Sequence, residues 1–239
     1  MPIYQIADLL VRYDPQYPML NTRSEQYRTA ETTDAAAWIG ADAQTLENLH
    51  QIHPNLSLEE CEYMQAGREF FTLLLSHDGM MLHASAVVVD GAAYLFSAPS
   101  GTGKSTHTAL WLKKFGDGAF LLNDDKPALR ILDGKVYAYG APFSGKFDLS
   151  VNVRMPVQGI AFIERSETNR IVRKSGKDAL YALLNQTVRP REVPLYTKLL
   201  QIIQTITEQI PIYTLYCNMD PQAADLSYEV MRKGNEDED

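Results

Sequence analysis

The chain has 239 residues, 45% of them hydrophobic, and a formal net charge of −8 from 22 basic and 30 acidic residues. This length and apolar content predict one large domain, or one domain with an N-terminal elaboration. The acidic balance argues against a nucleic-acid partner, because such proteins gather positive charge. Part of the acidity lies in the tail GNEDED (234–239), which we expect to be solvated.

The sequence carries no visible targeting or membrane signal. The opening stretch MPIYQIADLLVRYDPQ has charges where a secretory signal would be apolar. No apolar run approaches the ~20 residues that cross a bilayer. Cys61 and Cys217 lie far apart without metal-type spacing, so we expect reduced, buried thiols. These features predict a cytoplasmic protein with no membrane partner.

The first 78 residues predict an α+β segment. IYQIADLLVRY (3–13) favours a strand. A helix is expected after Ser57, which can cap its N-terminus ahead of Glu59 and Glu60, with apolar residues at helical spacing up to Leu75.

The remaining elements alternate between strands and helices. Asp90-Gly91 and Asp133-Gly134 are hairpin turn pairs within 83–98 and 127–140. Because hairpins lie on both sides of the central motif, we expect a mixed sheet in an α/β fold. The other expected elements are a helix at 106–116, a strand at 119–125, two strands within 157–175, helices at 176–188 and 193–209, a strand at 210–217 and a helix at 220–234.

The stretch SGTGKST (100–106) has the chemistry of a phosphate-binding loop, although Ala98 stands where such loops usually open with glycine. It follows an apolar strand and precedes a helix, which is the context that the motif requires. Its glycines let successive N–H groups face inward, and the helix N-terminus adds partial positive charge. Lys104 is placed to neutralise phosphates, and Ser105 offers a hydroxyl to Mg²⁺, with Thr106 as the spare. The predicted nucleotide-binding residues are Ser100, Gly101, Thr102, Gly103, Lys104, Ser105 and Thr106. A glycine-rich turn with an exposed lysine is the alternative.

Three further sites are candidates. Asp124 and Asp125 end an apolar strand in NDDKPALR (123–130), a usual arrangement for orienting Mg²⁺, although a polar turn would also explain them. His83 precedes the first hairpin. In PFSGK (142–146), Ser144 and Lys146 are possible substrate or phosphate contacts. The remaining histidines carry no functional signal, and His107 is expected near solvent.

Together these motifs resemble the HPr kinase/phosphorylase family, whose fold is shared with the phosphoenolpyruvate carboxykinases. The interval of 21 residues between His83 and Lys104 is similar to the family's interval. NDDKPALR and PFSGK look like the small bacterial HPr-kinase-like proteins, including kinases that phosphorylate a serine of lasso-peptide precursors. The similarity covers about residues 80 to 175. It implies a mixed-sheet P-loop domain of HPr kinase and carboxykinase type at 79–239, with the α+β segment at 1–78 packing on it.

The resemblance also implies roles for single residues. Lys104 and Ser105 would hold phosphates and Mg²⁺, Asp124 would be the catalytic base, Asp125 would support the metal, and His83 would lie beside Asp124. The implied activity is ATP- and Mg²⁺-dependent phosphorylation of a hydroxyl, with a serine of a peptide or small protein as the expected acceptor.

Two departures from the family bear on the substrate. The glycine-rich stretch that follows the second hairpin in HPr kinases is replaced by GAPFSGK (140–146), and the oxaloacetate-site pattern of the carboxykinases is absent. The alternatives are therefore a small-molecule kinase, a carboxykinase-like enzyme, a bare ATPase, or a nucleotide-binding regulatory module without transfer.

Overall fold

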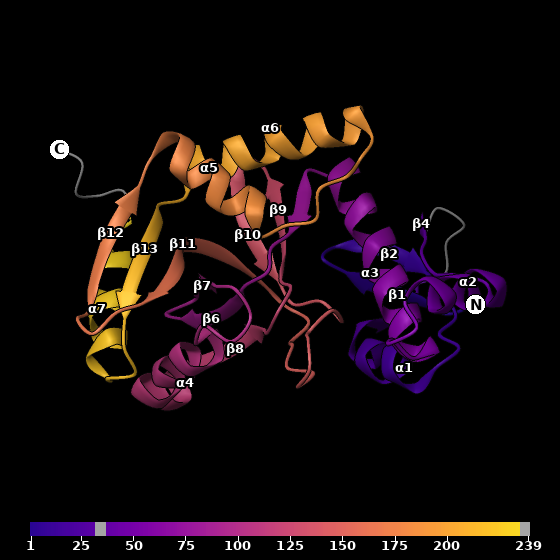
Figure 1. Cartoon of the computed structure of the whole chain (residues 1–239), viewed down its shortest axis with the longest axis horizontal. Coiled ribbons are helices and arrows are strands. Elements are labelled where there is room, and N and C mark those ends of the chain that lie inside the picture. Colours follow the sequence, from indigo (N-terminus) through magenta and orange to yellow (C-terminus); the bar gives the residue numbers. More distant parts are fainter. Residues whose placement is uncertain (32–36, 235–239) are drawn as a thin grey trace.

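The structure is a computed structural model that describes residues 1–31 and 37–234, so the predicted solvated tail at 235–239 lies outside the described residues. The chain forms a mixed α/β fold with a curled mixed sheet and helices on both of its faces (Figure 1). The predicted mixed sheet is therefore confirmed.

The N-terminal segment contains a small four-stranded sheet, in the order β3-β1-β2-β4. The expected single strand at 3–13 is wrong: the chain turns back at Ala7 and Asp8, where φ is 51° and 58°, and forms an antiparallel hairpin. Its strands are β1 (Ile3–Ile6), β2 (Leu9–Arg12), β3 (Arg28–Thr29) and β4 (Ala37–Trp38).

The large sheet has the order β5-β9-β10-β11-β7-β6-β8, with β13 and then β12 continuing from a second edge of β11. Both predicted hairpins are present, as β6–β7 and β9–β10. The strands are β5 (Gly79–Met81), β6 (Ser85–Val89), β7 (Ala92–Ser97), β8 (Ala119–Asn123), β9 (Ala128–Leu132), β10 (Lys135–Tyr139), β11 (Arg154–Arg165), β12 (Arg170–Lys174) and β13 (Ile212–Cys217).

The sheet branches and curls at β11. The first residues of this strand pair with β10, and its last six pair with β13, while β7 occupies the opposite edge. A long strand with three partners cannot keep them all in one plane, because neighbouring strands are twisted relative to each other.

Helices cover both faces of the large sheet. On β6, Val87 and Val89 pack with Trp111 on one face, whereas Ala86 and Val88 belong to the core on the other. This alternation follows from the two-residue period of a strand. Helices α4 and α7 lie on the first face, and α3, α5 and α6 contribute to the second core (Figure 1). The helices are α1 (Pro18–Ser24), α2 (Ala43–Ile52), α3 (Leu58–Ser76), α4 (Lys104–Phe115), α5 (Gly176–Asn185), α6 (Val193–Gln209) and α7 (Gln222–Met231), with short 3₁₀ turns η1 (Glu25–Tyr27) and η2 (Gly116–Gly118).

The predicted helix caps are present in α3. The Ser57 hydroxyl accepts a hydrogen bond from the Glu60 N–H, and the Glu60 carboxylate accepts one from the Ser57 N–H. Two of the N–H groups that a helix start leaves unpaired are satisfied in this way.

The N-terminal segment lies directly against the large sheet. Arg130 donates to the carbonyl of Ala7 at 2.7 Å, and Tyr139 donates to Asp8 at 2.7 Å. Residues of both parts share one hydrophobic core. The division of the chain at residues 78 and 79 stays a prediction.

Two observations concern the remaining predictions. Among the described residues, no helix is long and apolar enough to cross a membrane. Cys61 and Cys217 are buried and free, as predicted.

The topology places the candidate residues at one edge of the sheet. Strands β7, β11 and β13 are parallel, and β8 runs in the same direction because both β7 and β8 are antiparallel to β6. Ligands of open α/β sheets bind at the carboxyl ends of such strands. Strand β6 begins at this edge, which brings His83 to it as well.

Candidate functional site

The loop between β7 and α4 contains two glycines at positive φ and ends at the N-terminus of a helix. Gly101 and Gly103 adopt φ values of 78° and 124°, which side chains disfavour. Helix α4 begins at Lys104, so the N–H groups of Gly103 to Thr106 have no acceptor within the helix. Ala98 is 1% exposed and packs in the core beside α4, so a small residue fits where glycine was expected.

Arg165, at the end of β11, holds this loop from outside. Its guanidinium donates to the carbonyl of Thr102 at 3.0 Å and also to the carbonyl of Gly101. Fixing these carbonyls toward Arg165 orients the adjoining peptide units of the loop. No motif in the sequence indicated Arg165, because it reaches the loop only through the parallel pairing of β7 with β11.

A cavity of about 340 Å³ lies over the loop and the start of α4. The loop and this cavity are named the phosphate loop and the phosphate cavity after the ligand predicted from the sequence. It gathers the phosphate loop, both aspartates and His83, which the sequence places in three separate stretches. Its lining residues are His83, Pro99, Ser100, Gly101, Gly103, Lys104, Ser105, Thr106, Asp124, Asp125, Lys146 and Phe147.

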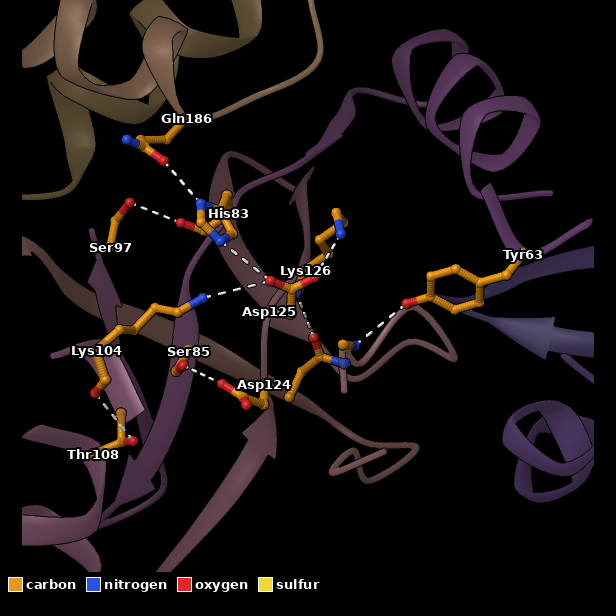
Figure 2. A network of polar contacts seen from close by, with 12 residues as sticks. Tyr63, His83, Ser85, Ser97, Lys104, Thr108, Asp124, Asp125, Lys126 and Gln186 are labelled. Carbon is orange, nitrogen blue, oxygen red and sulfur yellow. Dashed lines mark hydrogen bonds and ion pairs between the residues drawn. The ribbon is translucent and has the colours of Figure 1, made fainter. Parts of the chain in front are cut away.

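Asp125 is the centre of the charged cluster in this cavity (Figure 2). Its Oδ1 lies 3.2 Å from His83 Nε2 and 3.6 Å from Lys104 Nζ, and its Oδ2 lies 2.5 Å from Lys126 Nζ. Burial alone would raise the pKa of Asp125, but the hydrogen bond from His83 and the two ammonium groups outweigh burial and hold this pKa well below its usual range. Asp125 is therefore an anion surrounded by three cationic or proton-donating groups.

Burial also acts on Lys104. It lowers the pKa of Lys104, and the carboxylates of Asp125 and Asp124 partly offset that effect. The ammonium is thus poorly hydrated and depends on nearby anions. A phosphate chain would provide such anions.

The two adjacent aspartates have different surroundings. Asp124 is 8% exposed, and its Oδ1 accepts a hydrogen bond from the Ser85 hydroxyl. We expected His83 beside Asp124, and this expectation is wrong, because its Nε2 pairs with Asp125 instead. The chain leaves β8 after Asn123 and adopts φ 80° at Asp125, so the aspartates do not follow the alternation of a strand.

His83 is fixed by a residue that the sequence did not single out. Its Nδ1 lies 3.0 Å from Gln186 Oε1, and its backbone N–H donates to the Gln186 carbonyl at 2.7 Å. The two ring nitrogens therefore face different side chains, Nδ1 toward Gln186 and Nε2 toward Asp125. Gln186 directly follows α5, so no local motif could have indicated the contact.

The PFSGK stretch contributes differently from the prediction. Ser144 is buried and donates to Asp148 at 2.8 Å, and it does not line the phosphate cavity, whereas Lys146 does. Position 145 requires glycine for steric reasons, because a Cβ there would lie 2.6 Å from the Cβ of Asp125. The glycine lets this loop pack directly on the aspartate.

The residues present fit a magnesium site of the kind that substrate phosphates complete. Ser105, Asp124 and Asp125 all line the same cavity. The described residues contain no group of three or more His, Cys, Asp or Glu side chains that could hold a metal ion. Mg²⁺ commonly takes one or two carboxylates together with phosphate oxygens and water, which suits this sparse set.

A second cavity, of about 660 Å³, continues on the other side of the loop. It shares Gly101, Gly103 and Thr106 with the phosphate cavity. Its other lining residues are Thr102, His107, Ile163, Arg165, Ser166, Glu167, Cys217, Asn218 and Met219. His107 was expected near solvent, and this is wrong: it is 2% exposed, because α4 turns this face toward the sheet and α7.

Comparison with solved structures shows distant structural similarity. The chain is similar to the structure of the Hpr(Ser) kinase/phosphatase from Coxiella burnetii, with 16% sequence identity and a TM-score of 0.36, over 64% of this chain and 97% of that chain. No protein-family model and no curated protein match the chain.

Proposed function

We propose that this protein is an ATP- and Mg²⁺-dependent phosphotransferase that phosphorylates a hydroxyl. The proposed acceptor is a serine of a peptide or small protein. The observation that carries the proposal is the pairing of Lys104 with Asp125, 3.6 Å apart in the cavity above the phosphate loop. A phosphate-binding cation next to a carboxylate is the arrangement that phosphoryl transfer to a hydroxyl requires.

The lysine and the loop bind the phosphates in this proposal. The N–H groups at the start of α4 and the Lys104 ammonium contact phosphate oxygens, and Arg165 keeps the loop in shape. Ser105 and Asp124 would hold the metal ion, whose charge would offset the charge that develops on the phosphate.

Asp125 is proposed as the base in place of Asp124, because Asp125 is the aspartate that contacts His83. Phosphates that draw the Lys104 ammonium away remove one of the charges that depress the Asp125 pKa. Nucleotide binding would therefore make Asp125 more basic as the acceptor hydroxyl arrives. His83, held by Gln186, orients the carboxylate.

The cavity next to Arg165 and Met219 is proposed to accommodate the ribose and base. It adjoins the phosphate cavity through three shared residues, so one elongated nucleotide can occupy both. The assignment of residues 79–239 to a P-loop domain of HPr kinase and carboxykinase type belongs to the same proposal, as does a cytoplasmic location.

The test follows the γ-phosphate. The protein is mixed with Mg-ATP and a pool of seryl and threonyl peptides, free serine and oxaloacetate, and products are assigned by phosphorus NMR and mass spectrometry. Lys104→Ala is the blank, and Lys113→Ala, on an exposed position of the same helix, is the matched control. A phosphomonoester made by the wild type and by Lys113→Ala, and not by Lys104→Ala, is expected.

Other products would redirect the proposal. Phosphorylated free serine alone would indicate a small-molecule kinase, and phosphoenolpyruvate a carboxykinase-like enzyme. ADP and phosphate without an acceptor product would indicate an ATPase. Bound but intact ATP would favour a regulatory module, and no binding of ATP would overturn the nucleotide site itself.

A further inference from the structure

A third cavity, of about 510 Å³, lies on the opposite side of the charged cluster from the phosphate loop. It is formed between α3 of the N-terminal segment and residues 185–188, which follow α5. Its wall is largely apolar, with Tyr63, Phe71, Met81 and Phe143 among the lining side chains. This volume is in the range of cavities that bind small ligands or one large side chain of a peptide.

The third cavity meets the phosphate cavity at His83, which lines both. Lys126 lines the third cavity, called the apolar cavity below, and contacts Oδ2 of Asp125. Lys104 lines the phosphate cavity and contacts Oδ1 of the same aspartate. Figure 2 shows Asp125 between Lys104 on one side and Tyr63 on the other. The proposed base thus lies between the two cavities.

The geometry of phosphoryl transfer determines the side from which an acceptor must approach the nucleotide. The attacking oxygen and the leaving oxygen lie on opposite sides of the transferred phosphorus. With the nucleotide over the loop, an acceptor must approach from beyond the γ-phosphate. The apolar cavity reaches His83 and Lys126, which both contact Asp125, from a different side than the loop, so it is suited to deliver an acceptor.

The charge of the cavity restricts the acceptor further. Arg68 and Lys126 contribute two cations to the lining, and no carboxylate is among the lining residues. Lys126 is paired with Asp125, whereas the structure gives the Arg68 guanidinium no ion pair within residues 1–31 and 37–234. Arg68 is exposed at the rim of this cavity, so its guanidinium is free to pair with an anionic group on a ligand that occupies the cavity.

We propose that the apolar cavity binds the body of the phosphate acceptor, a peptide that carries a large apolar side chain beside its hydroxyl residue and a carboxylate that reaches Arg68. This inference rests on the proposed function. In the reaction, a bond forms between the acceptor oxygen and the γ-phosphorus, the bond from that phosphorus to the β–γ bridging oxygen breaks, ADP leaves, and the hydroxyl proton passes to Asp125.

The experiment measures binding and transfer separately with three probes: N-acetyl-Ser-Phe with a free carboxylate, its C-terminal amide, and N-acetyl-Ser-Gly with a free carboxylate. Val188→Trp fills the mouth of the cavity from a position that is 50% exposed, and Val172→Trp, at a position 46% exposed on β12, is the matched control. Arg68→Gln removes the cation, and Lys113→Gln is its control. Dissociation constants for each probe and for ATP are measured by calorimetry, and transfer by mass spectrometry.

The free acid of N-acetyl-Ser-Phe should have a Kd at least about tenfold lower than that of N-acetyl-Ser-Gly, since burial of an aromatic ring contributes at least that much binding free energy. Val188→Trp should remove this preference, and Arg68→Gln should remove the preference for the acid over the amide. Both variants should keep the Kd of the wild type for ATP.

The inference would be overturned, even where ATP binds and transfer occurs, by any of three results. These are equal binding of all three probes, no binding of any probe, or an unchanged preference of Val188→Trp for N-acetyl-Ser-Phe over N-acetyl-Ser-Gly. ATP that fails to bind, or that binds equally to Lys104→Ala, would overturn the proposed function instead. The two failures are therefore distinguishable.

Discussion

The imidazole of His83 lies against Asp125, with Nε2 3.2 Å from Oδ1, while the neighbouring Asp124 accepts a hydrogen bond from Ser85. Adjacent carboxylates in one short motif therefore have different partners. In the proposed function, this separation lets one aspartate act on the acceptor and the other on the metal, since the environment of a carboxyl group sets its role.

Asp125→Asn should lower kcat by about 10²- to 10⁴-fold, the usual contribution of a general base. The Kd for ATP should not rise, because the variant removes a carboxylate that competes with phosphate for Lys104. Asp124→Asn should instead raise the Mg²⁺ concentration needed for half-maximal activity. Magnesium titrations of the transfer rate measure the kcat and the magnesium requirement, and calorimetry with ATP measures the Kd.

The control for this pair is Asp133→Asn, at an exposed turn where φ is 49° and asparagine is well tolerated. Its rate and magnesium dependence should match the wild type. A full rate for Asp125→Asn together with a lost rate for Asp124→Asn would return the role of base to Asp124.

Gln186→Leu should lower kcat by about tenfold and leave the KM for ATP unchanged, because the glutamine positions His83 without touching the nucleotide cavities. A looser His83 hydrogen bond lets the pKa of Asp125 rise toward its usual value, so the acid limb of the rate profile should move to higher pH. Gln186→Glu keeps an acceptor oxygen and should restore the profile. A uniform loss of rate at every pH would indicate a purely structural role.

Arg165→Ala should weaken ATP binding by about fivefold, a modest effect because the guanidinium is exposed to solvent. The loss reflects a looser loop, since Arg165 contacts loop carbonyls and Lys104 remains in place. Arg191→Ala, in an exposed segment, is the control. Isothermal titration with ADP and ATP measures the change, and an unaltered Kd for Arg165→Ala would show that the loop holds its shape alone.

The stability of the protein should fall in mild acid because of His107. Burial lowers the pKa of this side chain from 6.5 to about 4. Between these values the unfolded chain binds a proton that the folded chain does not. The free energy of unfolding therefore decreases by up to about 3 kcal/mol as the pH is lowered from 6.5 to 4. Above pH 6.5 His107 is neutral in both states, and the protein loses no stability through this residue.

Urea unfolding of wild type and His107→Gln at a series of pH values measures this effect. The variant should be less stable at neutral pH and should lose less stability between pH 6.5 and 4. His77→Gln, at an exposed position, should follow the wild type. Parallel curves for wild type and His107→Gln would exclude His107 as the cause.

The sequence predicted the elements around the loop well because their signals are local. Asp90-Gly91 and Asp133-Gly134 supply turn chemistry at single sites, and Ser57 with Glu60 forms its cap within one helical turn. The strand–loop–helix context of SGTGKST is equally local. The turn at Ala7 and Asp8 was missed because alanine rarely adopts positive φ and Asp8 is not followed by the glycine that marks the other two hairpins.

The contacts that shape the site depend on tertiary structure. Arg165 reaches the loop because β11 pairs with β7, and Gln186 reaches His83 from the end of α5. The choice between Asp124 and Asp125 depends on one backbone angle after β8. No periodicity or motif in a single sequence specifies these relationships.

The parallel pairing of β7 with β11 has a consequence for the order of folding. The strands are separated in sequence by α4, β8 and a hairpin, so their pairing closes a long loop and is intrinsically slow. The β6–β7 hairpin can form early, but Arg165 reaches the phosphate loop only after that late step. A bound nucleotide should therefore slow the rate of unfolding and leave the rate of folding almost unchanged.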